Sequence, residues 1–285
     1  MTPALLNPAS IAALLRDFDV RPSRALGQNF LADPNTARRI VRLAGIGADD
    51  RVLEIGPGLG SLTLALAEAG ASVVALELDR HVLDALASVV GDLPPVRVVE
   101  GDAFAVDLAA VVGVDPNATS TESWSVVANL PYNVATPLVM RVLETAPWVR
   151  SMLVMVQREV GERLAAPVGT KAYGAATVKV AYFASAEVVG TVPPTVFMPR
   201  PKVDSALVRL TRHVEPPVTV PSADDLFAIV RAGFSQRRKT LRRALAGRFG
   251  ADAGARLEAA GIDPGARAET LDLDAWAALT RGAGS

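Results

Sequence analysis

Short apolar runs alternate with helical periodicity along the first two thirds of the chain. Strand-like runs occur at residues 51–55, 71–76, 96–99, 124–128 and 151–156. Between most of them, apolar residues recur at helical spacing, over residues 61–69, 79–89 and 135–144. Strands that alternate with helices pair in parallel, and the helices then cover both faces of the sheet. The pattern therefore predicts an α/β fold with a doubly wound, Rossmann-like sheet.

Other stretches extend this pattern on both sides. Residues 186–192 and 205–210 mix polar and apolar side chains and predict a hairpin at the sheet edge. Residues 8–17 and 34–43 predict two short helices before the first strand. Residues 113–123 are polar without periodicity and predict a surface loop.

The chain changes character after the prolines at positions 216, 217 and 221. No strand-like run follows them, and the pattern is helical to the end. We therefore predict a larger, sheet-containing domain over residues 1–214 and a small helical domain over residues 215–285.

Composition narrows the class of protein. The chain has 285 residues, half of them hydrophobic, so it can bury a sizeable core. With 29 basic and 30 acidic residues, attraction to a nucleic acid must come from a local patch. The absence of cysteine and the presence of only two histidines disfavour a metal site and indicate a reducing compartment. The sequence has neither a secretion signal nor about 18 consecutive apolar residues, so we expect a cytoplasmic protein without membrane contact.

A glycine-rich turn joins the first strand to the helix after it. Gly56, Gly58 and Gly60 let the backbone approach a ligand closely, and the following helix N-terminus carries partial positive charge. Both features favour a nucleotide-like cofactor, although a tight packing turn is the alternative. The dinucleotide fingerprint requires a third glycine three residues after Gly58, where this chain has Ser61. The spacing therefore disfavours NAD.

Carboxylates follow the next two strands. Glu77 lies at the carboxyl end of its strand, where two acceptor oxygens suit the hydroxyls of a ribose. Asp102 follows the third strand and could accept a hydrogen bond from an adenine amine, although an isolated aspartate there also suits a turn. The series of Gly56, Glu77 and Asp102 at successive strand ends favours a cofactor such as S-adenosylmethionine.

The fourth strand ends in a group suited to a flat base that bears an amine. Such an amine is a poor nucleophile because its lone pair is delocalised into the ring. The side-chain oxygen of Asn129 and the carbonyl of Leu130 could accept its N–H groups and free that lone pair. Tyr132 could stack on the base and hold it for attack. The alternative is a strand-ending turn with a packing tyrosine.

A basic segment lies in the predicted helical domain. Residues 231–248 contain seven cations and no acid, whereas a solvated helix normally mixes the two signs. We interpret this segment as one helix that places cations one turn apart, with Leu241 and Leu245 packing inward. The candidate phosphate contacts are Arg237, Arg238, Lys239, Arg242 and Arg243.

Several of these motifs together resemble the KsgA family of ribosomal RNA adenine dimethyltransferases over about residues 20–250. The matching segments are residues 27–31 (GQNFL), 54–60 (EIGPGLG), Glu77, 101–103 (GDA), 129–132 (NLPY) and 197–205 (FMPRPKVDS). The resemblance implies a seven-stranded class I methyltransferase sheet with a small helical C-terminal domain. It also implies transfer of four methyl groups from S-adenosylmethionine to N6 of two adjacent adenosines near the 3′ end of 16S ribosomal RNA.

The resemblance also implies roles for single residues. Asn29 and Leu31 are expected to contact the cofactor from an N-terminal lid, and Ala103 lies in its adenine-binding motif. Asn129 is expected to face both the cofactor and the target amine. Phe197 is expected to be a second stacking ring for the target base. Many family members carry proline where this chain has Arg200, which we expect to add a cation near the RNA entrance.

Two alternatives remain open at this point. One is an Erm-type methylase that acts on 23S ribosomal RNA and shares nearly every motif. The other is a non-catalytic RNA-binding assembly factor that retains the cofactor fold. We expect a monomer that meets 16S ribosomal RNA in the small subunit or its precursor, with a role in subunit biogenesis.

Overall fold

A computed structural model describes residues 4–23, 26–91, 93–115 and 123–282. Most of the polar loop predicted at residues 113–123 lies outside these ranges. The chain divides into two compact units, which are described separately. The first comprises Met1–Gly161 and Glu187–Arg212, and the second comprises Glu162–Ala186 and His213–Ser285.

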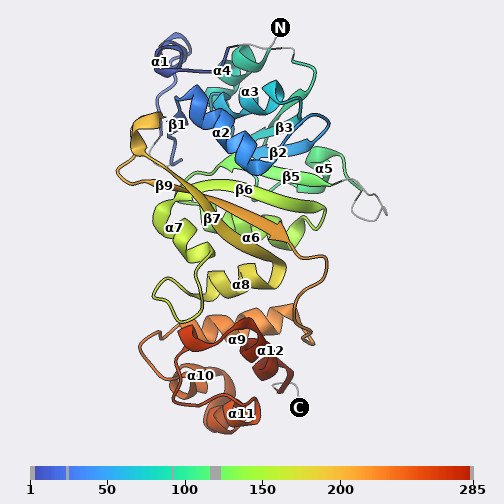
Figure 1. Ribbon diagram of the computed structural model, residues 1–285, viewed down its shortest axis with the longest axis vertical. Helices are drawn as coiled ribbons and strands as arrows, with labels where there is room; N and C mark the ends of the chain where they lie inside the picture. Colours follow the sequence, from blue (N-terminus) through green and yellow to red (C-terminus); the bar gives the residue numbers. More distant parts are fainter. Residues whose placement is uncertain (1–3, 24–25, 92, 116–122, 283–285) are drawn as a thin grey trace. The chain divides into compact units, whose positions relative to one another are not determined.

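The first unit is built on a seven-stranded sheet with the order β4-β3-β2-β5-β6-β9-β7 (Figure 1). The strands are β2 (Arg51–Ile55), β3 (Ser72–Glu77), β4 (Val96–Glu100), β5 (Trp124–Asn129), β6 (Val149–Gln157), β7 (Ala184–Val192) and β9 (Ser205–Arg212). Strands β2 to β6 pair in parallel, and β9 runs antiparallel to β6. The doubly wound fold is confirmed. The two stretches predicted as an edge hairpin are neighbours in the sheet, and β7 forms the edge.

Helices of the first unit follow the predicted alternation. They are α1 (Pro8–Asp17), α2 (Pro34–Ala44), α3 (Ser61–Glu68), α4 (Arg80–Val90), α5 (Leu108–Val112), α6 (Ala135–Thr145) and α7 (Arg158–Leu164), whose last residues belong to the second unit. Local capping explains several of their starts. The carboxylate of Asp33 accepts from the main-chain N–H groups of Asn35 and Thr36, so α2 begins at Pro34.

Two arginines of β9 cap helix ends on opposite faces of the sheet. Arg209 and Arg212 are three residues apart in an extended strand, so their side chains leave it in opposite directions. Arg209 donates to the carbonyl of Leu43 at the end of α2, at 2.7 Å. Arg212 donates to the carbonyl of Leu143 near the end of α6, at 2.9 Å. Carbonyls at helix ends lack intrahelical partners, and these guanidinium groups satisfy them.

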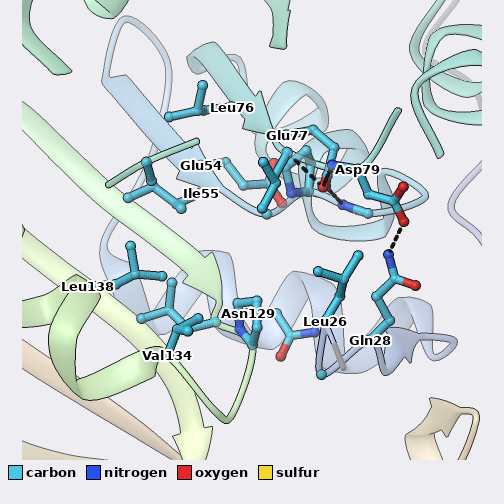
Figure 2. Close-up of a pocket in the computed structure, with 18 of the residues that line it drawn as sticks. Leu26, Gln28, Glu54, Ile55, Leu76, Glu77, Asp79, Asn129, Val134 and Leu138 are labelled. Carbon is cyan, nitrogen blue, oxygen red and sulfur yellow. Dashed lines mark hydrogen bonds between the residues drawn. The ribbon is translucent and has the colours of Figure 1, made fainter. Parts of the chain in front are cut away.

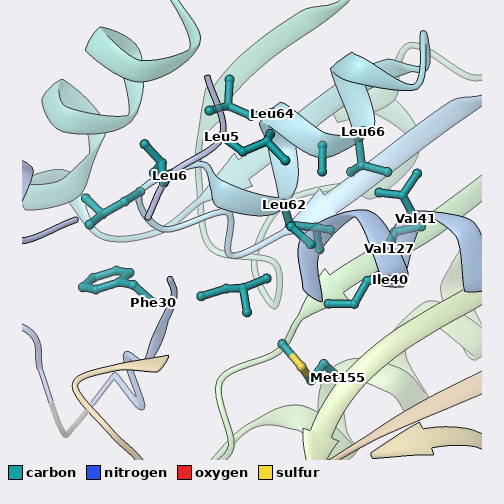
Figure 3. Packing of buried hydrophobic residues seen from close by; sticks show 14 of the residues in the cluster. Leu5, Leu6, Phe30, Ile40, Val41, Leu62, Leu64, Leu66, Val127 and Met155 are labelled. Atoms are coloured by element: carbon teal, nitrogen blue, oxygen red, sulfur yellow. The ribbon is translucent and has the colours of Figure 1, made fainter. Parts of the chain in front are cut away.

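A second, two-stranded sheet joins segments that are far apart in the sequence. Strand β1 (Phe30–Leu31) pairs antiparallel with β8 (Phe197–Met198), with Phe30 opposite Met198. Figure 3 shows Phe30 in the same apolar core as Ile40, Leu62 and Met155. This pairing and burial hold the N-terminal segment on the sheet-containing unit.

The second unit is helical in its described residues, apart from the first residues of β7. Its helices are α8 (Ala175–Phe183), α9 (Ala223–Phe234), α10 (Leu241–Phe249), α11 (Ala253–Ala259) and α12 (Leu273–Gly282), with the last turn of α7. Trp276 is fully buried at its centre, and a Cβ at Gly233 would lie 2.5 Å from the Trp276 ring. Close packing of α9 against α12 therefore requires glycine at position 233.

The second unit begins before residue 215, the predicted start of the helical domain. It includes Glu162–Ala186, which carries helix α8. Tyr182 of α8 packs edge-to-face on Phe227 of α9, with 5.4 Å between ring centroids. The hydroxyl of Tyr173 donates to the carbonyl of Leu271 at 2.9 Å. These contacts attach an earlier segment of the chain to the helical core.

The prediction of one continuous basic helix over residues 231–248 is wrong. Helix α9 ends at Phe234 and α10 begins at Leu241, with a turn between them. The hydroxyl of Ser235 donates to the carbonyl of Ala232, which competes with continuation of the helix. Thr240 is extended, with φ −66° and ψ 155°, so it cannot belong to either helix. Arg238 and Lys239 lie in the turn. They are therefore not one helical turn away from Arg242 and Arg243 on a common helix face.

Candidate cofactor and target-base site

One pocket lies where the carboxyl ends of β2, β3 and β5 meet the loop after β4 (Figure 2). Its lining includes every residue predicted to bind cofactor: Asn29, Leu31, Gly56, Gly58, Glu77, Asp102, Ala103 and Asn129. It also includes Leu130 and Tyr132 from the predicted target-base group. Parallel strands bring their carboxyl ends to one edge, which explains why Gly56, Glu77 and Asn129 share this pocket although they are far apart in the sequence.

The glycine turn is closed on one side by the N-terminal segment. Gly58 has φ +56°, and a Cβ built on it would lie 2.9 Å from the Phe30 ring. Glycine at position 58 therefore serves both the left-handed backbone and the close packing of Phe30. The main-chain N–H of Gly58 donates to Oε2 of Glu77 at 2.9 Å, which ties the turn to the end of β3.

Glu77 is buried, and backbone donors hold its carboxylate. Its Oε1 accepts from the main-chain N–H groups of Leu78 and Asp79, each at 2.9 Å. Burial raises the pKa of Glu77, and these backbone hydrogen bonds, with that from Gly58, act in the opposite direction. Each carboxylate oxygen can accept more than one hydrogen bond, so the fixed group retains capacity for ribose hydroxyls.

Glu54 is a second buried carboxyl in the pocket lining, and sequence reasoning gave it no role. Its side chain lies in β2 with 1% exposure, and the hydroxyl of Thr63 donates to its Oε2 at 2.7 Å. Burial, with a smaller contribution from Glu77, raises the pKa of Glu54 to about 8, while the Thr63 hydrogen bond lowers it. An acid inside an apolar strand run was the available sequence signal.

The loop after β4 forms another part of the wall. Oδ1 of Asp102 accepts from the main-chain N–H of Phe104 at 2.8 Å, and Gly101 donates to the carbonyl of Glu77 at 2.8 Å. These bonds place Ala103 and Phe104 in the lining. Oδ2 of Asp102 accepts no hydrogen bond from a described residue, so it is available for the predicted contact with an adenine amine.

The N-terminal segment is tied to both sides of the pocket. Nδ2 of Asn129, at the end of β5, donates to the carbonyl of Asn29 at 3.0 Å. On the opposite side, Nε2 of Gln28 donates to Oδ2 of Asp79 at 2.6 Å, as Figure 2 shows. We call residues 26–31 the lid. Sequence reasoning missed Gln28 and Asp79 because the two residues are 51 positions apart and meet only in the fold.

Tyr132 is held through its hydroxyl. This hydroxyl lies 2.7 Å from Oγ of Ser205, which is buried at the start of β9. Burial raises the pKa of Tyr132, while the hydrogen bond with Ser205 acts in the opposite direction. The main-chain N–H of Leu130 donates to the carbonyl of Met155 at 3.1 Å, which fixes the backbone next to Asn129. A ring with a fixed position suits the stacking role predicted for Tyr132.

Phe197 and Arg200 are not among the described residues that line the pocket. Phe197 is 5% exposed and pairs with Leu31 between β8 and β1. Arg200 is exposed on the loop after β8. Phe197 is thus buried beside the N-terminal segment, and its predicted role as a stacking ring stays a prediction.

The charges of the pocket are of one sign. Its described lining contains the carboxyl groups of Glu54, Glu77, Asp79 and Asp102, and no lysine, arginine or histidine. A dinucleotide would bring a negatively charged pyrophosphate beside these groups, which would repel it. S-Adenosylmethionine has a cationic sulfonium and no phosphate. The acidic lining therefore fits the predicted cofactor and disfavours NAD.

The predicted RNA-binding residues lie in the second unit, except Arg200. Arg237 donates to the carbonyls of Lys171 and Tyr173, each at 2.8 Å, so its guanidinium braces a neighbouring loop. The other four cations are exposed and make no ion pair with any described residue: Arg238, Lys239, Arg242 and Arg243. The loop held by Arg237 also presents Lys171, an exposed cation that sequence reasoning missed.

Comparison with known proteins identifies close relatives. A family model described as ribosomal RNA adenine dimethylase matches residues 21–281. The protein named ribosomal RNA small subunit methyltransferase A from Nocardia farcinica is 50% identical, over 97% of this chain and 94% of that protein. The protein of the same name from Rhodococcus opacus is 47% identical, over 97% and 94%.

Solved structures agree with the fold. The 23S ribosomal RNA methyltransferase ErmE superposes with a TM-score of 0.67 at 26% identity, covering 90% of this chain and all of that one. A dimethyladenosine transferase from Plasmodium falciparum superposes with a TM-score of 0.72 at 24% identity, covering 88% and 95%. With a family model matching nearly the whole chain and relatives at about half identity, this chain belongs to the ribosomal RNA adenine dimethylase family, whose methyl donor is S-adenosylmethionine.

Proposed function

We propose that this chain dimethylates N6 of two adjacent adenosines near the 3′ end of 16S ribosomal RNA. The observation that carries the proposal is one pocket that combines the glycine turn, the acidic lining and Asn129, Leu130 and Tyr132. The names of the Nocardia and Rhodococcus relatives favour the small subunit as the source of the RNA. We further propose that the chain acts as a monomer in the cytoplasm. Among the described residues, no helix is long and apolar enough to cross a membrane.

The protein has to position the target amine and activate it for attack. When bound, S-adenosylmethionine supplies a methyl group that its sulfonium already activates, so no strong base is needed. Asn129 uses Nδ2 to hold the lid, which leaves Oδ1 to accept an N–H of the target amine. The carbonyl of Leu130 accepts the second N–H. With both N–H groups bound, the nitrogen becomes pyramidal and its lone pair is released from the ring for attack.

Tyr132 holds the base during this step. Its hydroxyl bond to Ser205 orients the ring, so that a flat base can stack on its face. After transfer, the nitrogen carries a positive charge and loses a proton to water. A second transfer to the same nitrogen requires the demethylated cofactor to leave and a new S-adenosylmethionine to bind.

The exposed cations of the second unit are proposed to hold the RNA backbone. A purine inside folded RNA has to leave its stack to enter a pocket, and phosphate contacts anchor the strand while it does so. Arg238, Lys239, Arg242 and Arg243 are suited to this because no described acid neutralises them. We add Lys171 to this set and remove Arg237, because Arg237 is engaged with main-chain carbonyls.

Mass spectrometry of ribosomal RNA from cells with and without this protein tests the proposal. We expect dimethyladenosine to disappear from two adjacent positions of 16S RNA, with 23S RNA unchanged. A change confined to 23S RNA would favour the Erm-type alternative, for which the structural similarity to ErmE is the supporting observation. Unchanged methylation of both RNAs, together with altered subunit assembly, would favour a non-catalytic assembly factor.

A further inference from the structure

Glu54 is the most deeply buried carboxyl in the pocket lining, and it accepts a single hydrogen bond from the described residues. Glu77 receives hydrogen bonds from three main-chain N–H groups, whereas Glu54 receives one, from the hydroxyl of Thr63 to Oε2. Its Oε1 has no hydrogen-bond donor among the described residues. A buried carboxylate with so little support is costly when ionised.

The ionisable groups around Glu54 make this cost larger. Glu77 faces it from β3, and Asp79 and Asp102 complete the acidic lining at the ends of β3 and β4. The elements α3 and β5 contribute the neutral side chains of Thr63 and Asn129. No described lining residue brings a positive charge to the pocket. A cation that enters the pocket therefore changes the balance at Glu54 more than at the better supported Glu77.

The cofactor and its product differ by one such charge. S-Adenosylmethionine carries a sulfonium, which becomes a neutral thioether in S-adenosylhomocysteine after methyl transfer. We propose that Glu54 is protonated in the free pocket and in the product complex, and releases its proton to solvent when the sulfonium form of the cofactor binds. Glu54 thereby distinguishes cofactor from product by charge. The proposal rests on the proposed use of this pocket for the cofactor.

The proton balance is simple. Binding of the cationic cofactor converts the carboxylic acid of Glu54 to a carboxylate, and one proton passes to the buffer. Methyl transfer removes the positive charge from the cofactor, and Glu54 takes a proton back from solvent before the product leaves. The product then meets a neutral acid, which gives it no charge attraction. The expected consequence is that S-adenosylmethionine affinity depends on pH, whereas S-adenosylhomocysteine affinity depends on it much less.

Calorimetric titration of the full chain in buffers of different ionisation enthalpy measures the protons released on binding. With the Glu54 pKa at about 8, linkage predicts that S-adenosylmethionine releases about 0.9 proton at pH 7 and binds about tenfold more tightly at pH 9 than at pH 7. S-Adenosylhomocysteine should show neither effect. Equal proton release with both ligands would overturn the proposal. Failure of both ligands to bind would instead contradict the use of this pocket for the cofactor.

Two variants identify the group that releases the proton. Glu54→Gln should remove the release and the pH dependence while S-adenosylhomocysteine affinity stays within about twofold. The amine of each ligand titrates in both proteins, so its contribution cancels in the difference. Retained release in Glu54→Gln would assign the proton to another carboxyl, Glu77 first, and overturn the proposal.

Thr63→Val keeps Glu54 and removes the hydroxyl that supports its ionised form. The rise in S-adenosylmethionine affinity should therefore move to higher pH than in the parent chain. This variant keeps the test valid if Glu54→Gln does not fold. An unmoved pH profile in Thr63→Val would contradict the assignment to Glu54.

Discussion

Nδ2 of Asn129 donates a hydrogen bond of 3.0 Å to the main-chain carbonyl of Asn29, across 100 positions of sequence. The bond connects the residue that should activate the target amine with the lid over the cofactor. It also orients the Asn129 amide, because the oxygen must then point away from the lid carbonyl. The proposed covering of the cofactor and the proposed activation of the amine thus both depend on the Asn129 side chain.

Replacing Asn129 should separate its two roles. Asn129→Ala should lower the rate of methyl transfer by about 10²–10³-fold, by analogy with removal of a single polar group from a catalytic site. RNA affinity should stay close to that of the parent chain, since the RNA is proposed to be held elsewhere. Asn129→Asp retains an oxygen acceptor but repels the carbonyl of Asn29, so we expect it to weaken cofactor binding more than Asn129→Ala does. Single-turnover kinetics measures the rate of methyl transfer, and titrations measure cofactor and RNA affinity. Asn35→Ala, at an exposed asparagine, is the matched control.

The other attachment of the lid can be tested through Gln28. Gln28→Ala loses a hydrogen bond to a charged group, Asp79, which is worth about 1.5 kcal/mol. Cofactor affinity should therefore fall by about tenfold. Gln28→Glu, which places a second carboxylate beside Asp79, should weaken it further. Isothermal titration measures both, with exposed Gln236→Ala as control; equal affinities in all four proteins would show that the lid does not need this bond.

Arg212 is expected to stabilise the sheet-containing unit. Its guanidinium satisfies main-chain carbonyls at the end of α6 and at Val149, and burial lowers its pKa. Arg212→Gln leaves several of these acceptors without a donor, so we expect the free energy of unfolding to fall by about 2 kcal/mol. Exposed Arg150→Gln, on β6, should change it little. Urea denaturation compares the two; similar losses would point to a general charge effect.

The buried acid Glu54 predicts a direction for stability against pH. Its pKa is raised from 4.5 to about 8 on folding, so the folded chain keeps a proton that the unfolded chain loses. Below the unfolded pKa the two states bind this proton equally, and as pH rises from about 4.5 to 8 the folded state becomes relatively less favourable. Glu54→Gln removes this loss. Thermal melts without ligand should therefore show the variant gaining on the parent chain from pH 5 to pH 8; a constant difference would contradict the raised pKa.

Residues close in sequence were the easiest part of the site to predict. The apolar strand runs and the glycine turn report local geometry, and parallel pairing then places Glu77, Asp102 and Asn129 at one sheet edge. The partner of Tyr132 could not be found in this way. Ser205 lies 73 positions away, on an antiparallel strand whose position depends on the whole sheet.

The basic segment shows a different limit of sequence reasoning. Glutamine, arginine and lysine are good helix formers, so residues 235–240 read as helix on local propensity. Tertiary contacts decide otherwise. The main-chain N–H groups of Leu241 and Arg242 donate to the carbonyls of Ala266 and Pro264, at 2.8 and 3.2 Å, and this fixes a new helix start. Arg237 then binds main-chain carbonyls of the loop at residues 171–173, a contact that the local sequence does not predict.

Arg237 is bonded to main-chain carbonyls, whereas the four neighbouring cations are exposed, so Arg237 serves as a control for substitutions of the other four. Replacing Arg238, Lys239, Arg242 and Arg243 by glutamine should weaken RNA binding and lower the slope of log affinity against log salt by up to about 3, because each phosphate contact releases counterions. Cofactor affinity and melting temperature should stay near those of the parent chain, since these side chains have no described partner to lose.

Arg237→Gln should behave in the opposite way. It loses two hydrogen bonds to main-chain carbonyls, so the melting temperature should fall. The slope of log affinity against log salt should change by less than the roughly 0.7–0.9 expected for one phosphate contact. Filter binding across a salt series, with thermal melts of the same samples, measures both quantities. If the variant with four substitutions keeps its RNA affinity and salt slope, the phosphates are held elsewhere, and Arg21, Arg24 and Arg200 become the next cations to replace. If Arg237→Gln loses a full unit of slope without loss of stability, its guanidinium leaves the carbonyls to bind RNA.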